Sequence, residues 1–178
     1  MRRKAKQTRS IVTTNAILMA AAEVLEDFGY NRATTDRIAE RAGVSIGSVY
    51  QYFGNKLELF ERVFDRQSDL IVTGLQSYRI DESIPPSANL QKLLDISQGN
   101  MTPGQFRELG RIPELKGRIA HVSEVVLSAI AEFVGHFHPQ LPDKDRRIKA
   151  ELIGASAQSL GLIRRDKKGL TGAIALDL

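Results

Sequence analysis

Apolar residues recur along this chain at helical spacing. In the first helical segment they lie at i, i+4, i+7, i+8 and i+11, and these residues are Ile17, Ala21, Val24, Leu25 and Phe28. Gly29 follows directly, where a helix C-cap is expected. No segment shows the period-2 alternation of a strand, and there is no internal repeat of 20 to 50 residues. The pattern therefore predicts an all-α protein.

Two short helices are expected next. Thr34 and Thr35 are N-cap candidates for the first of them, and Gly43 ends it. Its apolar positions are Ile38, Ala39 and Ala42. Ser45 is placed to cap the second helix, which runs from Ile46 to about residue 52. Three helices with a tight turn at residues 43–45 are typical of a helix-turn-helix unit.

Longer helices are expected over the rest of the chain. Asn55 is placed to cap one that continues to about Ser77, with Leu57, Phe60, Val63, Phe64, Leu70 and Ile71 on its apolar side. Short helices near residues 90–96 and 103–111 follow, with loops at 81–89 and 97–104. Long helices are then expected from 119 to 137 and from 143 past 160, with Ile148, Leu152, Ala155 and Leu160 among the apolar positions of the last. Residues 170–178 are expected to start a further helix.

The third helix is expected to have one packed face and one free face. Ala39 is small enough for a close helix crossing, Gly43 can adopt a positive φ, and Val44 and Val49 are expected to fill the space between the two helices. The face left exposed contains no acidic residue and is formed by Ile46, Gly47, Ser48, Tyr50, Gln51 and Tyr52. Such a surface is suited to base edges and phosphates.

Residues 17–64 resemble the DNA-binding domain of the tetracycline-repressor (TetR) family. The matching residues are Ala21-Ala22, Phe28-Gly29-Tyr30, Thr34-Thr35, Ile38-Ala39, Ala42-Gly43-Val44-Ser45, Gly47-Ser48-Val49-Tyr50, Tyr52-Phe53, Lys56 and Leu59. The rest of the chain is similar to the family only in being helical. The resemblance implies a homodimer in which each subunit places its third helix in a major groove of operator DNA.

The resemblance also implies roles for individual residues. Thr35 and Arg37 are expected to contact phosphates from the start of the second helix. The groove-facing residues would be Ser45, Ile46, Gly47, Ser48 and Gln51, and Tyr50, Tyr52 and Lys56 would contact the DNA backbone. For Tyr50 and Tyr52 the alternative is aromatic packing under the long fourth helix. Val49 and Phe53 are expected to lie in the core.

Charge is concentrated at the start of the chain. The net charge is +4, and five basic residues occur in the first nine positions with no acidic one: Arg2, Arg3, Lys4, Lys6 and Arg9. In a helix-turn-helix protein such an arm is expected to contact phosphates or the minor groove, and the alternative is a solvated tail. Cysteine is absent, no signal peptide is recognised, and no apolar run approaches the ~20 residues of a membrane span. A cytoplasmic protein is therefore expected.

The sequence predicts two domains, an arm and helix-turn-helix domain at 1–56 and a helical domain at 57–178. The resemblance implies an effector pocket in the second domain and dimer contacts at its last two long helices. Candidate pocket residues are Leu93, Phe106, Val126, Ile130 and Phe133, and the alternative for each is plain core. The small residues at 154–157 fit close helix packing or ordinary core contacts equally well. Because the chain ends at Leu178, where the last helix of the family would continue, the expected dimer face is either incomplete or small.

The expected function is sequence-specific transcription regulation, most simply by a repressor that a small molecule releases from its operator. The alternative is a helix-turn-helix regulator without an effector, controlled by a protein partner or by its abundance. A polar, water-accessible cavity in the second domain would favour the first hypothesis, and a solid core would favour the second. The sequence contains no recognisable pair of a nucleophile and its base, and no paired carboxylates, so an enzyme is not expected. The three histidines are not spaced as a set of metal ligands, so neither a metal nor a cofactor is expected. The long fourth helix is expected to be the only covalent and rigid route from a pocket in the second domain to the third helix.

Overall fold

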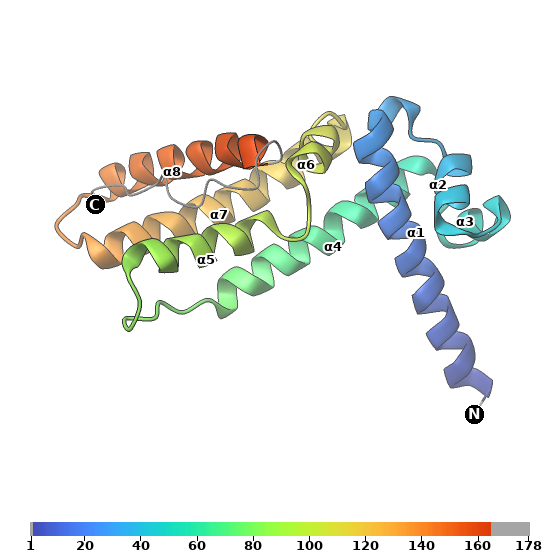
Figure 1. Cartoon of the computed structure of the whole chain (residues 1–178), viewed down its shortest axis with the longest axis horizontal. Coiled ribbons are helices and arrows are strands. Elements are labelled where there is room, and N and C mark those ends of the chain that lie inside the picture. Colours follow the sequence, from blue (N-terminus) through green and yellow to red (C-terminus); the bar gives the residue numbers. More distant parts are fainter. Residues whose placement is uncertain (1, 165–178) are drawn as a thin grey trace. The chain divides into compact units, whose positions relative to one another are not determined.

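The structure is a computed structural model that describes the backbone of residues 2–164 and the side chains of residues 10–157. Its regular elements are all helical, as predicted (Figure 1). The chain forms two compact units. The first comprises the chain up to Gln67 together with Gly104–Gly117, and the second comprises Ser68–Pro103 and the chain from Arg118 onward.

The first unit begins with α1 (Arg2–Arg32), which packs against α2 (Thr35–Ala42), and α2 packs against α3 (Ile46–Tyr52) (Figure 1). Gly29 interrupts α1 with a φ of 71° and a ψ of 165°, so the predicted end of the first helix is a kink followed by one more turn. Only a residue without a Cβ tolerates this conformation easily. The buried residues of α1 include Ile17, Ala21, Val24 and Leu25, the face that the periodicity predicted.

The fourth helix, α4 (Lys56–Ser77), starts as predicted at Asn55, whose side-chain oxygen accepts a hydrogen bond of 2.9 Å from the Glu58 N–H. A later segment also belongs to the first unit. It contains α6 (Pro103–Leu109) and the 3₁₀ turn η1 (Pro113–Leu115). The chain therefore passes between the two units three times, at 67/68, 103/104 and 117/118. The expectation that the fourth helix is the only covalent route is wrong.

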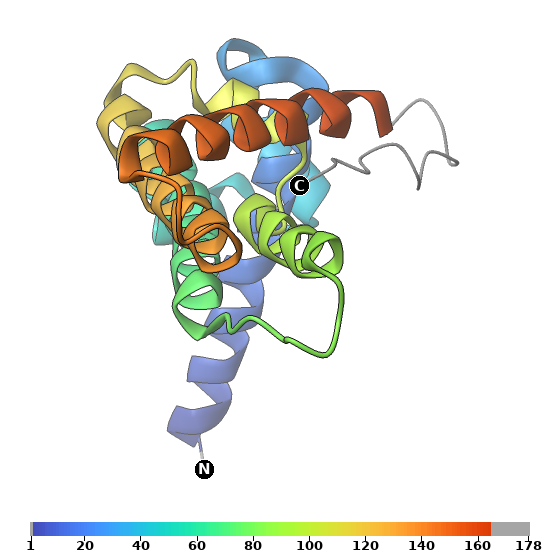
Figure 2. The ribbon, with the colours of Figure 1, turned by 90° about the vertical axis from the view of Figure 1, so that its left-hand side faces the viewer.

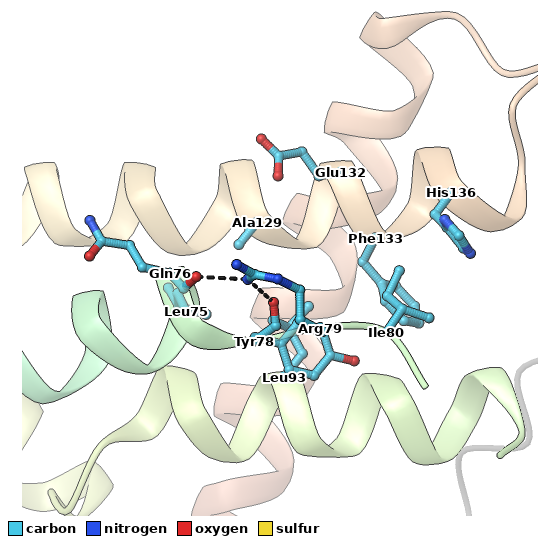
Figure 3. Close-up of a pocket in the computed structure, with 10 residues that line it drawn as sticks. All are labelled: Leu75, Gln76, Tyr78, Arg79, Ile80, Leu93, Ala129, Glu132, Phe133 and His136. Carbon is cyan, nitrogen blue, oxygen red and sulfur yellow. Dashed lines mark hydrogen bonds between the residues drawn. The ribbon is translucent and has the colours of Figure 1, made fainter. Parts of the chain in front are cut away.

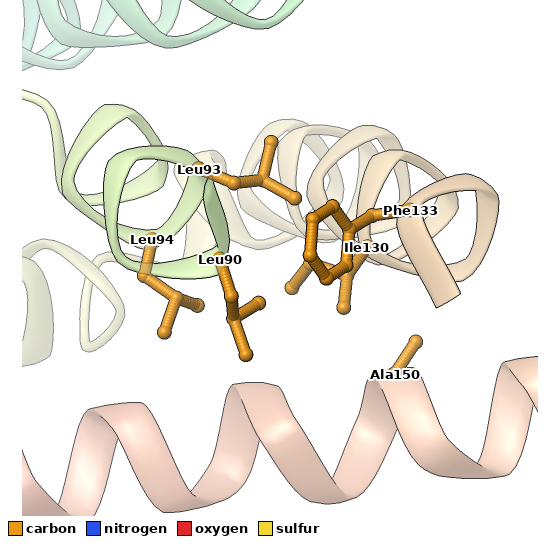
Figure 4. Close-up of a cluster of buried hydrophobic side chains, with 6 residues drawn as sticks. All are labelled: Leu90, Leu93, Leu94, Ile130, Phe133 and Ala150. Atoms are coloured by element: carbon orange, nitrogen blue, oxygen red, sulfur yellow. The ribbon is translucent and has the colours of Figure 1, made fainter. Parts of the chain in front are cut away.

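The second unit contains α5 (Pro86–Gln98), α7 (Lys116–Phe137) and α8 (Asp143–Arg164), which lie side by side (Figures 1 and 2). Buried residues from all three helices form one hydrophobic cluster (Figure 4): Leu90, Leu93, Leu94, Ile130, Phe133 and Ala150. On the surface, Arg147 of α8 makes two hydrogen bonds of 2.6 Å to Glu124 of α7. This pairing lowers the pKa of the Glu124 carboxyl below its ordinary value.

Several sequence expectations differ from the structure in detail. The predicted domain boundary at 56/57 lies before the boundary between the compact units, which falls inside α4. Leu70, Ile148 and Leu152, predicted on apolar helix faces, are 45%, 46% and 63% exposed. Periodicity assigns a residue to a face but does not identify which part of that face another helix covers. The side chain of Leu160 and the further helix expected at 170–178 lie outside the described residues.

One helical stretch of the described chain, Pro113–Phe137, is long enough and apolar enough to cross a membrane by length and composition alone. This corrects the expectation that no segment approaches that size. Ile130 and Phe133 of this stretch belong to the hydrophobic cluster of the second unit. In the structure 22% of the most apolar window of this stretch is buried.

Candidate nucleic-acid interface

The turn between α2 and α3 is fixed by short-range hydrogen bonds. The Thr34 hydroxyl caps α2 by accepting from the Arg37 N–H at 3.3 Å. Gly43 ends α2 in the left-handed conformation, with a φ of 66° and a ψ of 32°, as its place in the sequence predicted. The next N–H, of Val44, donates to the Ala39 carbonyl at 3.0 Å. Ser45 then caps α3 by accepting from the Ser48 N–H at 3.1 Å.

The short helix α3 has one buried and one exposed face. Val49 is fully buried and Phe53, just after the helix, is 4% exposed, which confirms that both lie in the core. On the other face Ile46 is 40% and Tyr50 is 52% exposed. Gly47 and Gln51 are exposed as well. Four of the six residues predicted for the free face are therefore exposed, and none of the six is acidic.

Two of the residues expected to contact the DNA backbone lie together. The Thr35 hydroxyl, at the start of α2, is 3.1 Å from the Tyr50 hydroxyl of α3. The contact places two hydroxyl groups side by side at the edge of the exposed face. Tyr52 is half-buried and Ser48 is half-buried with its hydroxyl 2.8 Å from that of Ser45. Hence Tyr50 is the more accessible of the two tyrosines.

The two cationic candidates, Arg37 and Lys56, already have partners within the unit. Arg37 donates to the Arg32 carbonyl at 2.6 Å, and its guanidinium lies 4.6 Å from the centre of the Phe28 ring. Lys56 donates to the Tyr30 carbonyl at 2.9 Å. Each cation keeps further N–H donors, since guanidinium has five and ammonium three. Both residues therefore also hold the end of α1 in place.

The basic residues of the arm, Arg2, Arg3 and Lys4, lie in the first turns of α1 rather than in a separate segment. Their side chains are outside the described residues.

A search with family models identifies the same region. Residues 17–63 match the model described as bacterial regulatory proteins, tetR family. These residues form a TetR-family DNA-binding domain. The matched span contains the second half of α1, all of α2 and α3 with their turn, and the first part of α4. Residues 17–64 were the part that resembled the family in sequence, and the model match confirms that resemblance.

Named relatives of the TetR-family domain include transcription regulators. The HTH-type transcriptional activator FasR of Mycolicibacterium smegmatis is 48% identical over 60 residues, which are 34% of this chain and 27% of that protein. The A-factor receptor protein of Streptomyces griseus is 37% identical over 67 residues, 38% of this chain and 24% of that protein. The match thus spans about a quarter of the length of these relatives.

Solved structures of named regulators share the fold of most of the chain. The fatty acid degradation regulator FadR of Bacillus halodurans superposes with a TM-score of 0.68 at 22% identity, over 88% of this chain and 87% of that one. FadR of Bacillus subtilis, solved in complex with stearoyl-CoA, gives 0.66 at 21% identity, over 86% and 89%. The TM-scores show a common fold, an N-terminal helix-turn-helix domain followed by a helical domain.

The structure adds residues to the TetR-family domain that the sequence analysis missed. Glu108 of α6 is only 8% exposed and accepts a hydrogen bond of 3.4 Å from the Tyr30 N–H. Arg111 pairs with the same carboxylate at 2.6 Å. Gln105, also buried, donates to the Ala22 carbonyl at 3.2 Å. No motif surrounds these residues, and the only indication was two polar side chains within a short helix that starts at a proline.

The second unit contains a cavity of about 510 Å³ (Figure 3). Its lining comes from the end of α4, the segment after it, α5 and α7: Leu75, Gln76, Tyr78, Arg79, Ile80, Leu93, Ala129, Glu132, Phe133 and His136. Of the predicted pocket residues, Leu93 and Phe133 line it. Ile130 and Val126 lie in or against the hydrophobic cluster instead, and Phe106 is in the first unit. Among residues with described side chains, no group of three or more metal-ligating residues occurs.

Proposed function

We propose that this chain regulates transcription by binding operator DNA through α3. The observation that supports this most is the two-faced character of α3, with Val49 buried and an uncharged face exposed at Ile46, Gly47, Tyr50 and Gln51. A helix held this way can enter a major groove while its other face remains packed. Thr35, Arg37, Tyr50 and Lys56 then contact phosphates and fix the register on the duplex. The basic residues of the first turns of α1 add sequence-independent affinity.

The regulator acts as a homodimer in the cytoplasm, with each subunit reading one half-site. Two large apolar residues of α8, Ile148 and Leu152, are exposed and are suited to burial against a second copy. Ala155 and Ser156 are exposed on the same helix, whereas Gly154 faces Leu127 of α7, at 3.6 Å from where a Cβ would lie. Half-sites of such a dimer are separated by one helical turn of DNA or a multiple of it.

A small molecule releases the protein from its operator. The open cavity of the second unit favours this reading over a regulator without an effector, because a solid core leaves no room for one. Ligand sites of this kind occupy about 300–1,000 Å³ and are mostly apolar, and this cavity is within that range. One relative is named as the receptor of A-factor, and the similar structure of Bacillus subtilis FadR contains bound stearoyl-CoA. They support the proposal by analogy alone.

The segment Gly104–Gly117 is the second route by which the cavity affects DNA binding. It is joined directly to α5 and α7, which contribute Leu93, Ala129 and Phe133 to the cavity. Through Glu108 the same segment is bonded to Tyr30, at the end of α1. A ligand that shifts α5 or α7 therefore also shifts the segment whose Glu108 is hydrogen-bonded to α1.

Recovery of protein-bound fragments from a fragmented bacterial genome tests this function. Enrichment of a short palindromic element, with affinity that falls steeply as salt increases, is expected. Equal recovery of all fragments would contradict sequence-specific regulation.

A further inference from the structure

The cavity of the second unit combines apolar walls with one cation. Its apolar residues are Leu75, Tyr78, Ile80, Leu93, Ala129 and Phe133. Arg79, an exposed residue, also lines the cavity, and in the close-up its guanidinium is located between the end of α4 and Ala129 of α7 (Figure 3). The other charged lining residues are Glu132, whose carboxylate is turned away from Arg79 in this view, and His136 (Figure 3). The His136 ring lies 3.8 Å from the Glu82 carboxylate.

Arg79 is held in place without being neutralised. Its Nη1 donates to two backbone carbonyls at the end of α4, Gln76 at 2.8 Å and Tyr78 at 2.6 Å. Among residues with described side chains, no carboxylate forms an ion pair with it. Carbonyl groups carry no net charge, so the guanidinium keeps its full positive charge, and Nε and Nη2 remain as donors.

The segment that carries Arg79 is fixed from its other side by Asn89, a fully buried polar residue. The Asn89 side-chain oxygen accepts from the Tyr78 hydroxyl at 3.2 Å and from the Asp81 N–H at 2.9 Å. Its amide group donates back to the Asp81 carbonyl at 2.9 Å. Residues on both sides of Arg79 and Ile80 are therefore tied to α5, and the cation is presented from an ordered backbone.

We infer that this cavity binds an amphipathic molecule with a single anionic group. The carboxylate or equivalent anion pairs with Nε and Nη2 of Arg79, and the apolar body packs against Ile80, Leu93 and Phe133. Guanidinium and carboxylate form paired, charge-assisted hydrogen bonds that are stronger than neutral ones. A cationic amphiphile is disfavoured because it would meet the Arg79 charge. The inference rests on the proposed function only in taking this cavity as the effector site.

Three probes of one chain length separate charge from apolarity: decanoate, decanol and decyltrimethylammonium. Each is titrated calorimetrically into the full chain below its micelle threshold. Decanoate is expected to bind about tenfold tighter than decanol, since a hydrogen bond to a charged group is worth about 1.5–3 kcal/mol and 1.4 kcal/mol is tenfold. Decyltrimethylammonium is expected to bind weakest. Equal affinities for decanoate and decanol, or no decanoate binding, would overturn the inference.

Variants locate the effect. Arg79→Gln is expected to reduce decanoate affinity to that of decanol, while Lys144→Gln, which removes one exposed charge from the same unit, leaves the preference intact. Ala129→Trp fills the cavity and is expected to abolish binding of both probes. If Arg79→Gln lowers the thermal midpoint but keeps the preference, Arg79 only caps α4 and the inference fails. Decanoate binding that depends on Arg79 but leaves operator binding unchanged supports the anion site and contradicts the effector role, so the two failures are distinguishable.

Discussion

The ammonium group of Lys56 lies 4.2 Å from the centre of the Tyr30 ring and donates a hydrogen bond of 2.9 Å to the Tyr30 carbonyl. The Tyr30 ring also meets Phe60 edge-on, with 5.5 Å between ring centres. The Tyr30 N–H donates to Glu108. Burial, more than the nearby acids Glu114 and Glu61, raises the pKa of its phenol. Hence α1, α4 and α6 meet at one residue of the DNA-binding unit.

Lys56→Ala is expected to reduce stability as well as DNA affinity. It removes a cation–π contact of about 0.5–1 kcal/mol and a hydrogen bond of about 1 kcal/mol. Urea unfolding measures the first effect. Binding to operator and to random DNA measures the second, and both affinities are expected to fall by similar factors because a phosphate contact has no base information. Arg62→Ala removes a charge from an exposed position of the same helix and is the control. Unchanged stability would refute the structural role.

Gln51→Ala is expected to relax sequence preference instead of weakening all binding. Gln51 is exposed in the last turn of α3, and a glutamine amide can pair with the major-groove edge of adenine. The expected loss is about 1–3 kcal/mol at one base pair in each half-site. Competition binding against a panel of single-base operator variants measures it. An equal loss on operator and random DNA would contradict base reading.

Gly47→Ala separates folding from DNA binding. A Cβ at Gly47 meets only the Ser45 hydroxyl, at an ordinary distance of 3.8 Å. Replacing a helical glycine by alanine is expected to stabilise the fold by about 0.5–1 kcal/mol. The added methyl group projects from the exposed face and is expected to weaken operator binding by obstructing close approach to the groove. Thermal unfolding and operator titration are measured together, and tighter operator binding would count against this face as the interface.

Much of the fold was predictable from local patterns. Helix caps at Thr34, Ser45 and Asn55, and the helix end at Gly43, were found where residue type and spacing placed them. Short-range hydrogen bonds decide these features, so the sequence alone specifies them. The burial of Val49 and Phe53 followed from the same pattern.

Long-range contacts were not predictable in this way. Glu108 joins Tyr30 from 78 positions further along the chain, and no periodicity relates the two. The membership of Gly104–Gly117 in the first unit was missed for the same reason. The cavity depends on Arg79 and Ile80, which lie in a loop where helical periodicity gives no facing rule. The predicted lining was therefore chosen from helix faces, and only Leu93 and Phe133 belong to it.

Asn89→Ala is expected to destabilise the second unit and disorder the cavity wall. The substitution removes the acceptor of the Asp81 N–H and the donor to the Asp81 carbonyl, whereas the Tyr78 hydroxyl keeps its 3.0 Å bond to the backbone carbonyl of residue 89. Leaving buried polar groups unpaired costs about 1–3 kcal/mol each, although solvent entry at this loop relieves part of it. Urea unfolding measures the loss. The control is Gln91→Ala. Gln91 is exposed, and its side chain donates a hydrogen bond to Asp95, one helical turn away. If both substitutions lower the free energy of unfolding by the same small amount, Asn89 does not hold the loop in place.

Glu108→Ala is expected to uncouple the cavity from the DNA-binding helices. The change removes the acceptor for the Tyr30 N–H and the partner of Arg111, while the cavity lining lies in other segments. Affinity for an effector such as decanoate is therefore expected to stay the same. Coupling between two ligands is reciprocal and is typically about 1–3 kcal/mol. In the native chain, operator DNA is thus expected to weaken decanoate binding about 5- to 150-fold.

In Glu108→Ala the factor by which operator DNA weakens decanoate binding is expected to approach one. The segment joined to α5 and α7 then lacks its hydrogen bond to Tyr30 of α1. Calorimetric titration of decanoate with and without saturating operator measures the factor in both proteins. Arg107→Ala, on the exposed side of α6 and 4.0 Å from the same carboxylate, is the matched control and is expected to keep most of the coupling. Substitution at Val63 in the middle of α4 tests the other route between the units, and Val63→Phe is expected to alter the factor more than the affinity for DNA alone. If Glu108→Ala leaves the factor unchanged while Val63→Phe abolishes it, coupling runs through α4 and not through Glu108.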